Sequence, residues 1–343
     1  MTNLHPLQAC WDLPLASLRA DALDTALRLQ LFQRLAAPVE PEQLAKALEL
    51  DATRLDALLA LLWSMGLLER RQVRRDGATL WRYCATELAQ RYFTEDNDTA
   101  CGAAWQARLT SLRQFGATIG TLLHGNAASG AASGSGPHWA EAARTHIAQE
   151  QRAVTMDVAR GILSRLPEFP HVQRMLDLGG GPGGVAIALA RENPRLRGVV
   201  FELPETAAVA HQAIADAGLA EQLEARGGDL TSDALGEGFD LIWCASVLHF
   251  VPDIHETLRC VRAALKPGGV LVCAQAEIPA TADAAQRVLS YYLPLLLRGH
   301  QVLPAGHLCQ AMEATGFIDI ERLDTVSIPL APVAVTIGRR APS

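Results

Sequence analysis

The sequence predicts a two-domain protein in which a helical amino-terminal domain precedes a doubly wound α/β domain. Its 343 residues exceed the length of one average domain, and 49% of them are hydrophobic, as in ordinary globular proteins. The first part of the chain has the pattern of helices followed by a hairpin, whereas strands and helices alternate from Val172 onward. We expect domains at 1–98 and 169–343, joined by a helical linker, 99–168, that contributes to the substrate pocket.

The amino-terminal domain is expected to be a winged helix, because three helices precede a hairpin. Asp51 is a suitable N-cap for the third helix, which would end at Gly66, and an Asp-Gly pair is a typical hairpin turn. The expected helices are Pro14–Leu35, Glu40–Leu48 and Asp51–Met65, and the expected strands are Leu67–Val73 and Thr79–Tyr83.

A winged helix can bind DNA, and four arginines between residues 70 and 75 are placed where a wing would contact phosphates. The third helix favours a different role, because its face offers leucines and Trp63 with a single basic residue. We therefore interpret this domain as a dimerisation domain.

The segment between the domains is expected to contain two helical stretches, Ala103–Leu123 and Trp139–Leu166. Between them, residues 126–137 consist of Asn, Ala, Ser, Gly and Pro, which cannot bury an apolar face. This run predicts a flexible loop, and the two helices would bridge the domains.

The carboxy-terminal domain is expected to contain a mostly parallel sheet that ends in an antiparallel hairpin. Helical segments such as Pro204–Ala217 and Ile254–Leu265 separate short apolar runs, whereas the last two runs have no long helix between them. The expected strands are Val172–Leu178, Gly198–Glu202, Leu223–Arg226, Phe239–Ala245, Val270–Gln275, Ile318–Leu323 and Val333–Gly338.

Charge and composition exclude several classes of protein. The net charge of −7 would repel a polyphosphate, so we expect no nucleic-acid partner. The first residues have no leader pattern and no run of 18 apolar residues occurs, so we expect a cytoplasmic protein without membrane contact. The seven cysteines form no CxxC pair and no Cys/His cluster, so we expect reduced thiols and no metal.

The strongest motif is a strand that runs into a glycine loop and then a helix, with Asp177 just before Gly179, Gly180 and Gly181. Glycines let the backbone approach a ligand closely, and the following helix offers free N–H groups. Glycine loops of this kind occur in several nucleotide-binding folds, and the aspartate that precedes this one is typical of sites for S-adenosylmethionine (SAM). We predict SAM as the cofactor.

Two further acids follow neighbouring strands. Glu202, which precedes Leu203, can accept hydrogen bonds from both ribose hydroxyls, or else caps the next helix. After the next strand, Gly228-Asp229-Leu230 offers a carboxylate for the adenine amino group and an apolar side chain for the ring. At the end of the fourth strand, we add Cys244 and Ala245 to the expected cofactor contacts.

With these motifs in place, the chain resembles the two-domain small-molecule O-methyltransferases, typified by the caffeate and hydroxyindole enzymes and their bacterial secondary-metabolite relatives. The resemblance covers nearly the whole chain and rests on 176–184, 201–204, 228–230, 247–249 and 313–317. It implies a class I methyltransferase fold, Rossmann-like, with a winged-helix dimerisation domain. It also implies a homodimer that methylates a hydroxyl of a small aromatic or polyketide-like acceptor and releases S-adenosylhomocysteine.

The resemblance implies that His249, after the fourth strand, is the catalytic residue. Neutral imidazole at the carboxyl end of a central strand suits a base for a phenol proton. The carboxylates that orient this histidine in the family are missing, because Gln275 replaces the first and Gln301 or Val302 the second. An amide stabilises imidazolium less than a carboxylate does, so His249 is either a weaker base or only a substrate contact.

By position, Trp139, Met156, Tyr292 and His300 are candidates to line the acceptor pocket, although each also suits core packing. Three alternatives stay open. The chain is an N- or C-methyltransferase of the same fold, a SAM-binding relative that catalyses a reaction other than methyl transfer, or a transcription regulator.

Overall fold

The computed structural model describes residues 5–75, 78–95, 97–124, 136–326, 328 and 331–342. Contacts divide the chain into two compact units, 1–111 and 112–343, which we describe separately. The three-part division expected from the sequence stays a prediction. In the described part of the chain, no helix is both long and apolar enough to cross a membrane.

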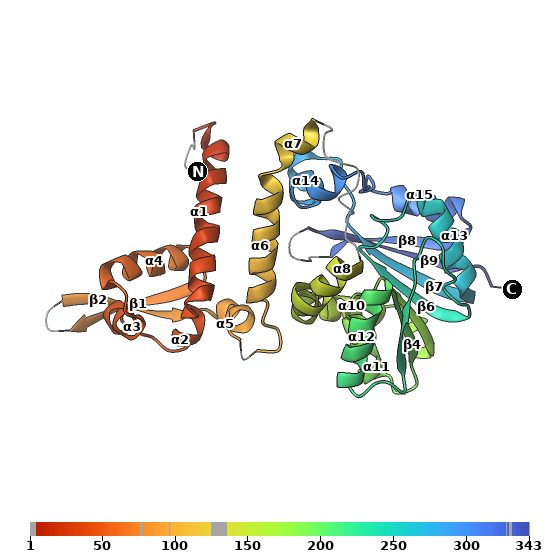
Figure 1. The fold of residues 1–343 in the computed structure, drawn as a ribbon, viewed down its shortest axis with the longest axis horizontal. Helices are drawn as coiled ribbons and strands as arrows, with labels where there is room; N and C mark the ends of the chain where they lie inside the picture. Colours follow the sequence, from red (N-terminus) through yellow and green to blue (C-terminus); the bar gives the residue numbers. More distant parts are fainter. Residues whose placement is uncertain are drawn as a thin grey trace. The chain divides into compact units, whose positions relative to one another are not determined.

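The amino-terminal unit is the expected winged helix. Its core contains Phe32, Leu59, Leu62 and Tyr83, each with almost no exposed surface. Asp51 caps the third helix as expected, because its side chain accepts a hydrogen bond from the Arg54 N–H at 2.8 Å. The elements are α1 (Gln8–Arg28), α2 (Leu31–Arg34), α3 (Pro41–Leu48), α4 (Ala52–Ser64), β1 (Leu68–Arg75), β2 (Ala78–Ala85) and α5 (Glu87–Phe93) (Figure 1).

One expectation for this unit is wrong, and one lies outside the described residues. The single helix expected at Pro14–Leu35 is wrong, since α1 begins at Gln8, ends at Arg28 and is separated from α2 by Gln30. Gln30 has a left-handed conformation, with φ of 52°, which an α-helix cannot include. The expected Asp76-Gly77 turn lies outside the described residues.

Among the four arginines between residues 70 and 75, Arg70 and Arg71 contact side chains of their own domain. The Arg70 guanidinium lies 3.3 Å from the ring centroid of Trp63 and 4.3 Å from that of Trp81. Arg71 lies 3.8 Å from the Glu69 carboxylate. A guanidinium stacked between two indoles is held by cation–π attraction, so these contacts favour protein packing over a phosphate-binding wing.

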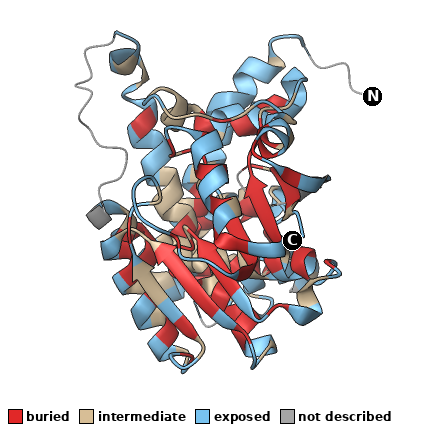
Figure 2. Cartoon of the chain, turned by 90° about the vertical axis from the view of Figure 1, so that its right-hand side faces the viewer, coloured by how far each residue is buried: buried red, intermediate tan, exposed pale blue. Residues whose placement is uncertain are grey.

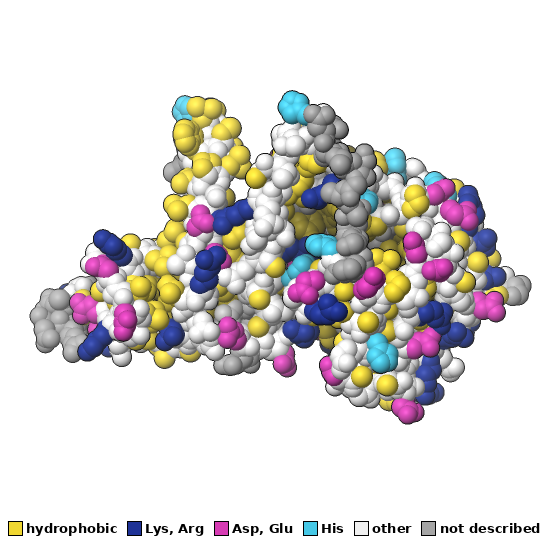
Figure 3. Space-filling view, in the orientation of Figure 1, with side chains coloured by type: hydrophobic (Ala, Val, Ile, Leu, Met, Phe, Trp, Pro, Cys, Tyr) yellow, Lys and Arg dark blue, Asp and Glu magenta, His cyan; other side chains and the backbone are white. Residues whose placement is uncertain are grey.

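One face of α1 carries large apolar side chains that this unit leaves exposed. Leu7, at the N-cap of this helix, and Trp11, Leu15 and Leu18 follow one another at intervals of four, four and three residues and are 49–65% exposed. Figure 3 shows hydrophobic side chains gathered over this helix. We call these four residues the α1 stripe.

The carboxy-terminal unit contains the expected doubly wound sheet, with strand order β5-β4-β3-β6-β7-β9-β8. The first five strands in this order are parallel, and β9 inserts antiparallel between β7 and β8. The strands are β3 (Arg174–Leu178), β4 (Arg197–Glu202), β5 (Leu223–Gly227), β6 (Phe239–Ala245), β7 (Leu265–Gln275), β8 (Phe317–Val326) and β9 (Val333–Arg340). The fold expected from the sequence, including its closing hairpin, is confirmed.

Helices cover both faces of this sheet. Met175, Leu241 and Val272 face a core formed with α10 (Met156–Leu163), α11 (Gly184–Glu192) and α12 (Pro204–Asp216). Neighbouring residues of the same strands face a second core formed with α13 (Ile254–Ala264) and α15 (His307–Ala314), since successive side chains of a strand alternate between faces. Figure 2 shows the resulting burial of the strands.

The order of strands reverses between β3 and β6, and ligands of such sheets bind outside the carboxyl ends of the strands at this point. The helix expected at Trp139–Leu166 is helical from Gly136 to Leu163 but contains two π-helical segments, Ala143–Ile147 and Gln151–Thr155. π-Helical turns are often found at functional sites.

The other expected helical stretch, Ala103–Leu123, is two helices, α6 (Gly102–Gly116) and α7 (Ile119–Leu123). Of the loop expected at 126–137, residues 126–135 lie outside the described part, and α8 (Gly136–Ala142) contains the last two. One more helix, α14 (Ala282–Leu296), follows β7.

Candidate active site

The glycine loop joins β3 to α11 at the reversal point. Gly179, Gly181 and Gly183 have left-handed conformations, with φ of 65°, 59° and 80°. Such a backbone favours glycine. A side chain at Gly179 would also collide with Val247, which follows β6. The loop therefore lies close against the turn after β6.

Asp177 supports this loop from beneath. It is 1% exposed, and a Cβ added to Gly180 would lie 2.6 Å from its carboxyl carbon. Burial raises the pKa of Asp177 to about 7, although a hydrogen bond from the Ala186 N–H opposes the rise. Its place below the loop suits shaping the cofactor site rather than touching the ligand.

Glu202 lies at the carboxyl end of β4, and one of its two oxygens contacts the glycine loop. Oε1 accepts a hydrogen bond from the Gly181 N–H at 3.1 Å, and Oε2 accepts one from the Leu203 N–H at 2.9 Å. Burial raises the pKa of Glu202. Each carboxylate oxygen can accept a second hydrogen bond, so the pair suits two neighbouring hydroxyls.

The segment after β5 offers a third polar group. Gly228 is buried, and a Cβ there would lie 2.6 Å from the Phe201 ring, so only glycine fits. Asp229 is exposed, and its Oδ1 accepts hydrogen bonds from Thr231 N and Oγ1 at 2.8 and 2.7 Å, which lower the pKa of Asp229. No hydrogen bond to its Oδ2 is found within the described part of the chain, so this oxygen can accept one from a ligand.

The remaining expected cofactor residues differ in accessibility. Leu203, Leu230 and Ala245 are partly exposed, whereas Cys244 is 1% exposed and packs within the sheet. The glycine cradle, the two acceptor oxygens of Glu202 and the free oxygen of Asp229 fit the amino-acid, ribose and adenine parts of SAM. Cys244 would act only through its backbone.

His249 follows β6 after a turn in which Ser246 has a φ of 56°, a conformation rare outside glycine. The ring is 4% exposed, and its Nδ1 lies 3.0 Å from the Gln301 carbonyl oxygen. Burial lowers the pKa of His249 to about 4. The imidazole is therefore neutral near pH 7, with Nδ1–H donating to Gln301.

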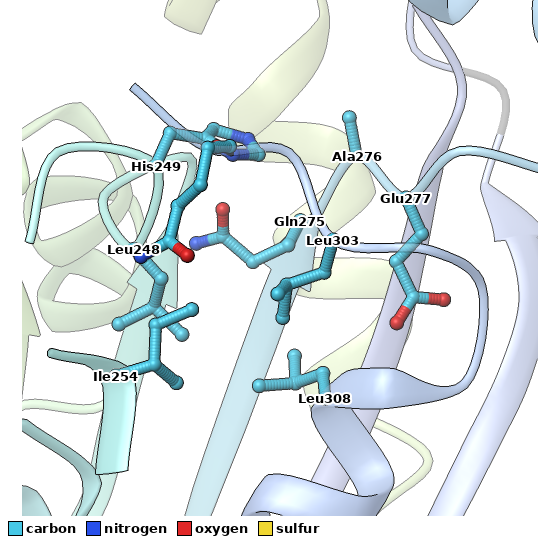
Figure 4. A pocket seen from close by; sticks show the side chains of 9 residues that line it. Leu248, His249, Ile254, Gln275, Ala276, Glu277, Leu303 and Leu308 are labelled. Carbon is cyan, nitrogen blue, oxygen red and sulfur yellow. Dashed lines mark hydrogen bonds between the residues drawn. The ribbon is translucent and has the colours of Figure 1, made fainter. Parts of the chain in front are cut away.

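Gln275, at the end of β7, holds the other nitrogen. We assign its amide with the oxygen accepting from the N–H groups of Ser246 and Val247, at 3.0 and 3.1 Å, because this orientation pairs both halves of the amide. The nitrogen then donates to His249 Nε2 at 3.2 Å. Figure 4, which draws the opposite amide orientation, shows Gln275 beside the histidine. Both ring nitrogens are thus engaged.

A small cavity lies beside this pair, between His249, Gln275 and Glu277 (Figure 4). Its volume of about 10 Å³ is enough for one water molecule at most. Glu277 is 4% exposed, and its Oε2 accepts hydrogen bonds from Arg322 Nε and Nη2 at 3.0 and 2.9 Å. An aromatic acceptor does not fit here.

Three of the four expected acceptor residues lie around His249 and Phe250. The centroid of the Phe250 ring lies 5.2 Å from that of Trp139 and 5.2 Å from that of His300. The ring centroids of Tyr292 and His249 lie 4.7 Å apart. We call these five residues the aromatic cluster. Met156 begins α10 and is half-buried, and its role stays a prediction.

Sequence reasoning missed two residues that organise the site. Gln151, in the second π-helical segment, accepts a hydrogen bond from the Gly184 N–H at 2.9 Å and donates one to the Gly180 carbonyl at 3.0 Å. Phe250 joins Trp139 to His300. A single glutamine in a helix carries no spacing signal, whereas Phe250 was visible as the residue that replaces an acid after His249.

Sequence families confirm the resemblance. The methyltransferase domain family matches residues 148–321, just over half of the 343 residues, and the O-methyltransferase dimerisation domain family matches residues 11–95. The structure of human N-acetylserotonin methyltransferase in complex with SAM superposes with a TM-score of 0.76 over 99% of both chains, at 19% identity.

Two curated proteins are similar over shorter stretches. Demethylspheroidene O-methyltransferase of Cereibacter sphaeroides is 30% identical over 161 residues, which cover 46% of this chain and 42% of that protein. Aclacinomycin 10-hydroxylase of Streptomyces purpurascens is 38% identical over 137 residues, 37% of this chain and 34% of that protein. The chain matches less than half the length of both relatives.

The fold and the site together define the class, a SAM-binding protein with the class I methyltransferase fold. Among such proteins, this chain belongs to the methyltransferase domain family, and its amino-terminal unit has the O-methyltransferase dimerisation domain.

Proposed function

We propose that the protein transfers the methyl group of SAM to a hydroxyl of a small aromatic or polyketide-like acceptor. The observation that carries this proposal is that the glycine loop and the aromatic cluster meet at the turn after β6. Val247 packs against Gly179 of the cofactor loop, and His249 and Phe250 of the same turn form part of the aromatic cluster. Aromatic side chains pack favourably against a flat aromatic acceptor.

In this proposal, the protein contributes to the reaction by positioning SAM and the acceptor. SAM supplies a methyl group activated by its sulfonium. Glu202 would hold the ribose hydroxyls and Asp229 the adenine amino group, while Asp177 and Gln151 keep the glycine loop in place. The aromatic cluster would orient the acceptor ring, and placing two reactants in line removes much of the entropic barrier.

The test is a turnover assay with SAM and a panel of phenols, naphthols and polyketide aromatics, with amines included. We expect S-adenosylhomocysteine and an acceptor heavier by one CH₂, with the methyl on oxygen. Methylation of amines or ring carbons alone would refute the transfer to oxygen.

A second candidate is a reaction that keeps SAM intact, such as hydroxylation. Two observations favour it: no carboxylate contacts His249 among the described residues, and a similar relative is named a hydroxylase. An acceptor that gains one oxygen without release of S-adenosylhomocysteine would support this function instead.

We further propose that the protein is a homodimer formed through the α1 stripe. The match to the dimerisation domain and the exposure of Trp11 and Leu15, 65% and 49%, support this. Obligate interfaces bury more than about 2,000 Å². The double variant Trp11→Glu/Leu15→Glu is expected to have a monomeric mass by light scattering, whereas wild type and an Arg19→Glu control stay dimeric.

A further inference from the structure

Neither ring nitrogen of His249 is free to bind the hydroxyl of a methyl acceptor. Its Nδ1–H donates to the Gln301 carbonyl, and its Nε2 accepts from the Gln275 amide. Both partners belong to segments that pack directly on the histidine, and the Gln301 side chain is itself fixed, since it donates to the Val251 carbonyl at 3.0 Å. A hydroxyl that used Nε2 would have to displace the amide of Gln275 from a buried site.

His300 stands next to the same site with an available nitrogen. The turn that follows α14 includes Gly299, whose φ is 86°, and the His300 N–H donates to the Leu295 carbonyl at 3.1 Å, so the backbone at this position is fixed. The His300 ring packs edge-on against Phe250, with an interplanar angle of 68°. Its Nε2 is buried and has no hydrogen-bond partner among the described residues.

The surroundings of His300 keep its ring neutral. Partial burial and the positive charge of Arg298 lower the pKa of His300. Arg298 lies over the Phe115 ring, at 5.3 Å from its centroid. An unpaired buried polar atom costs free energy, so a hydrogen bond from a ligand hydroxyl to the buried nitrogen of this neutral imidazole would be favourable.

We propose that His300, rather than His249, accepts the proton of the acceptor hydroxyl. This inference rests on the proposed function. The hydroxyl oxygen forms a bond to the methyl carbon while the carbon–sulfur bond breaks and its electron pair stays on sulfur. The hydroxyl proton moves to His300 Nε2 and then to water. His249 becomes a positioning residue that ties the turn after β6 to Gln275 and Gln301.

The test compares His300→Ala and His300→Gln with wild type on hydroxyl acceptors of graded acidity, from a weakly acidic naphthol to a nitrophenol. Exposed His211, on α12, supplies the control His211→Ala. Loss of a general base lowers kcat by roughly 10²- to 10⁴-fold. We expect this loss with the weakly acidic acceptor and a much smaller one with the nitrophenol, which ionises without help.

Binding separates this role from a structural one. Calorimetry should give S-adenosylhomocysteine the same Kd in both His300 variants as in wild type, within twofold. Equal losses on all acceptors, or a His300→Ala variant that keeps more than a third of kcat on the weak acid, would overturn the inference. If wild type methylates no hydroxyl at all, the proposed function fails as well, which is a different outcome.

Discussion

The buried His249 makes a quantitative prediction about stability. Its pKa is about 4 in the folded chain against 6.5 for an unperturbed histidine. A lowered pKa means that the unfolded chain binds the proton more readily, so this residue contributes stability above pH 6.5 that is lost as the pH falls toward 4. At about pH 5 the pH lies 1.5 units below the pKa of the unfolded chain, so the free energy of unfolding is lower by about 2 kcal/mol, at about 1.36 kcal/mol per unit.

The variant His249→Asn isolates this effect, because an asparagine amide can still donate to the Gln301 carbonyl but does not titrate. We expect the free energy of unfolding of wild type, relative to the variant, to fall by about 2 kcal/mol between about pH 8 and pH 5. The assay is urea unfolding at both values, with His211→Asn as control. An unchanged difference means that the ring is not buried as described, and a change of opposite sign means that it is charged in the fold.

Three further predictions concern the cofactor site. Glu202→Ala should weaken SAM binding more than tenfold by calorimetry, because charge-assisted hydrogen bonds contribute about 1.5–3 kcal/mol each, and a Kd within twofold of wild type would remove Glu202 from the site. Gln151→Ala should weaken S-adenosylhomocysteine binding about fivefold or more by freeing the loop, whereas Arg152→Ala on the same helix should not. Since the pKa of Asp177 is raised from 3.8 to about 7, its contribution to stability is lost as pH rises through 7; Asp177→Asn should therefore raise Tm more at about pH 8 than at pH 5, and an equal rise at both would contradict this.

Much of the fold was predictable from local patterns. The apolar strands of the sheet alternate with helices at regular intervals, and Asp51 and Gly66 mark the ends of α4 by their capping chemistry. The break of the first helix was not predictable, because the apolar spacing continues through Gln30, whereas the structure has a left-handed turn there and buries Phe32 in the core.

The cofactor side of the site was also determined by sequence. Glycines at 179, 181 and 183 are required by a backbone that residues with side chains rarely adopt, and Glu202 ends a strand that pairs with the strand before that loop. Local backbone chemistry and parallel strand order suffice to bring such groups together.

The acceptor side was decided only by tertiary structure. The engagement of both His249 nitrogens, and the lack of a partner for His300 Nε2 among the described residues, depend on segments that are distant in the chain, about 50 residues apart for His249 and Gln301, and that meet through packing. Burial sets the charge of both rings, and burial is a property of the whole fold that no short motif contains. The sequence alone thus predicted which residues would bind SAM, whereas the tertiary structure decided which histidine keeps a nitrogen without a hydrogen-bond partner among the described residues.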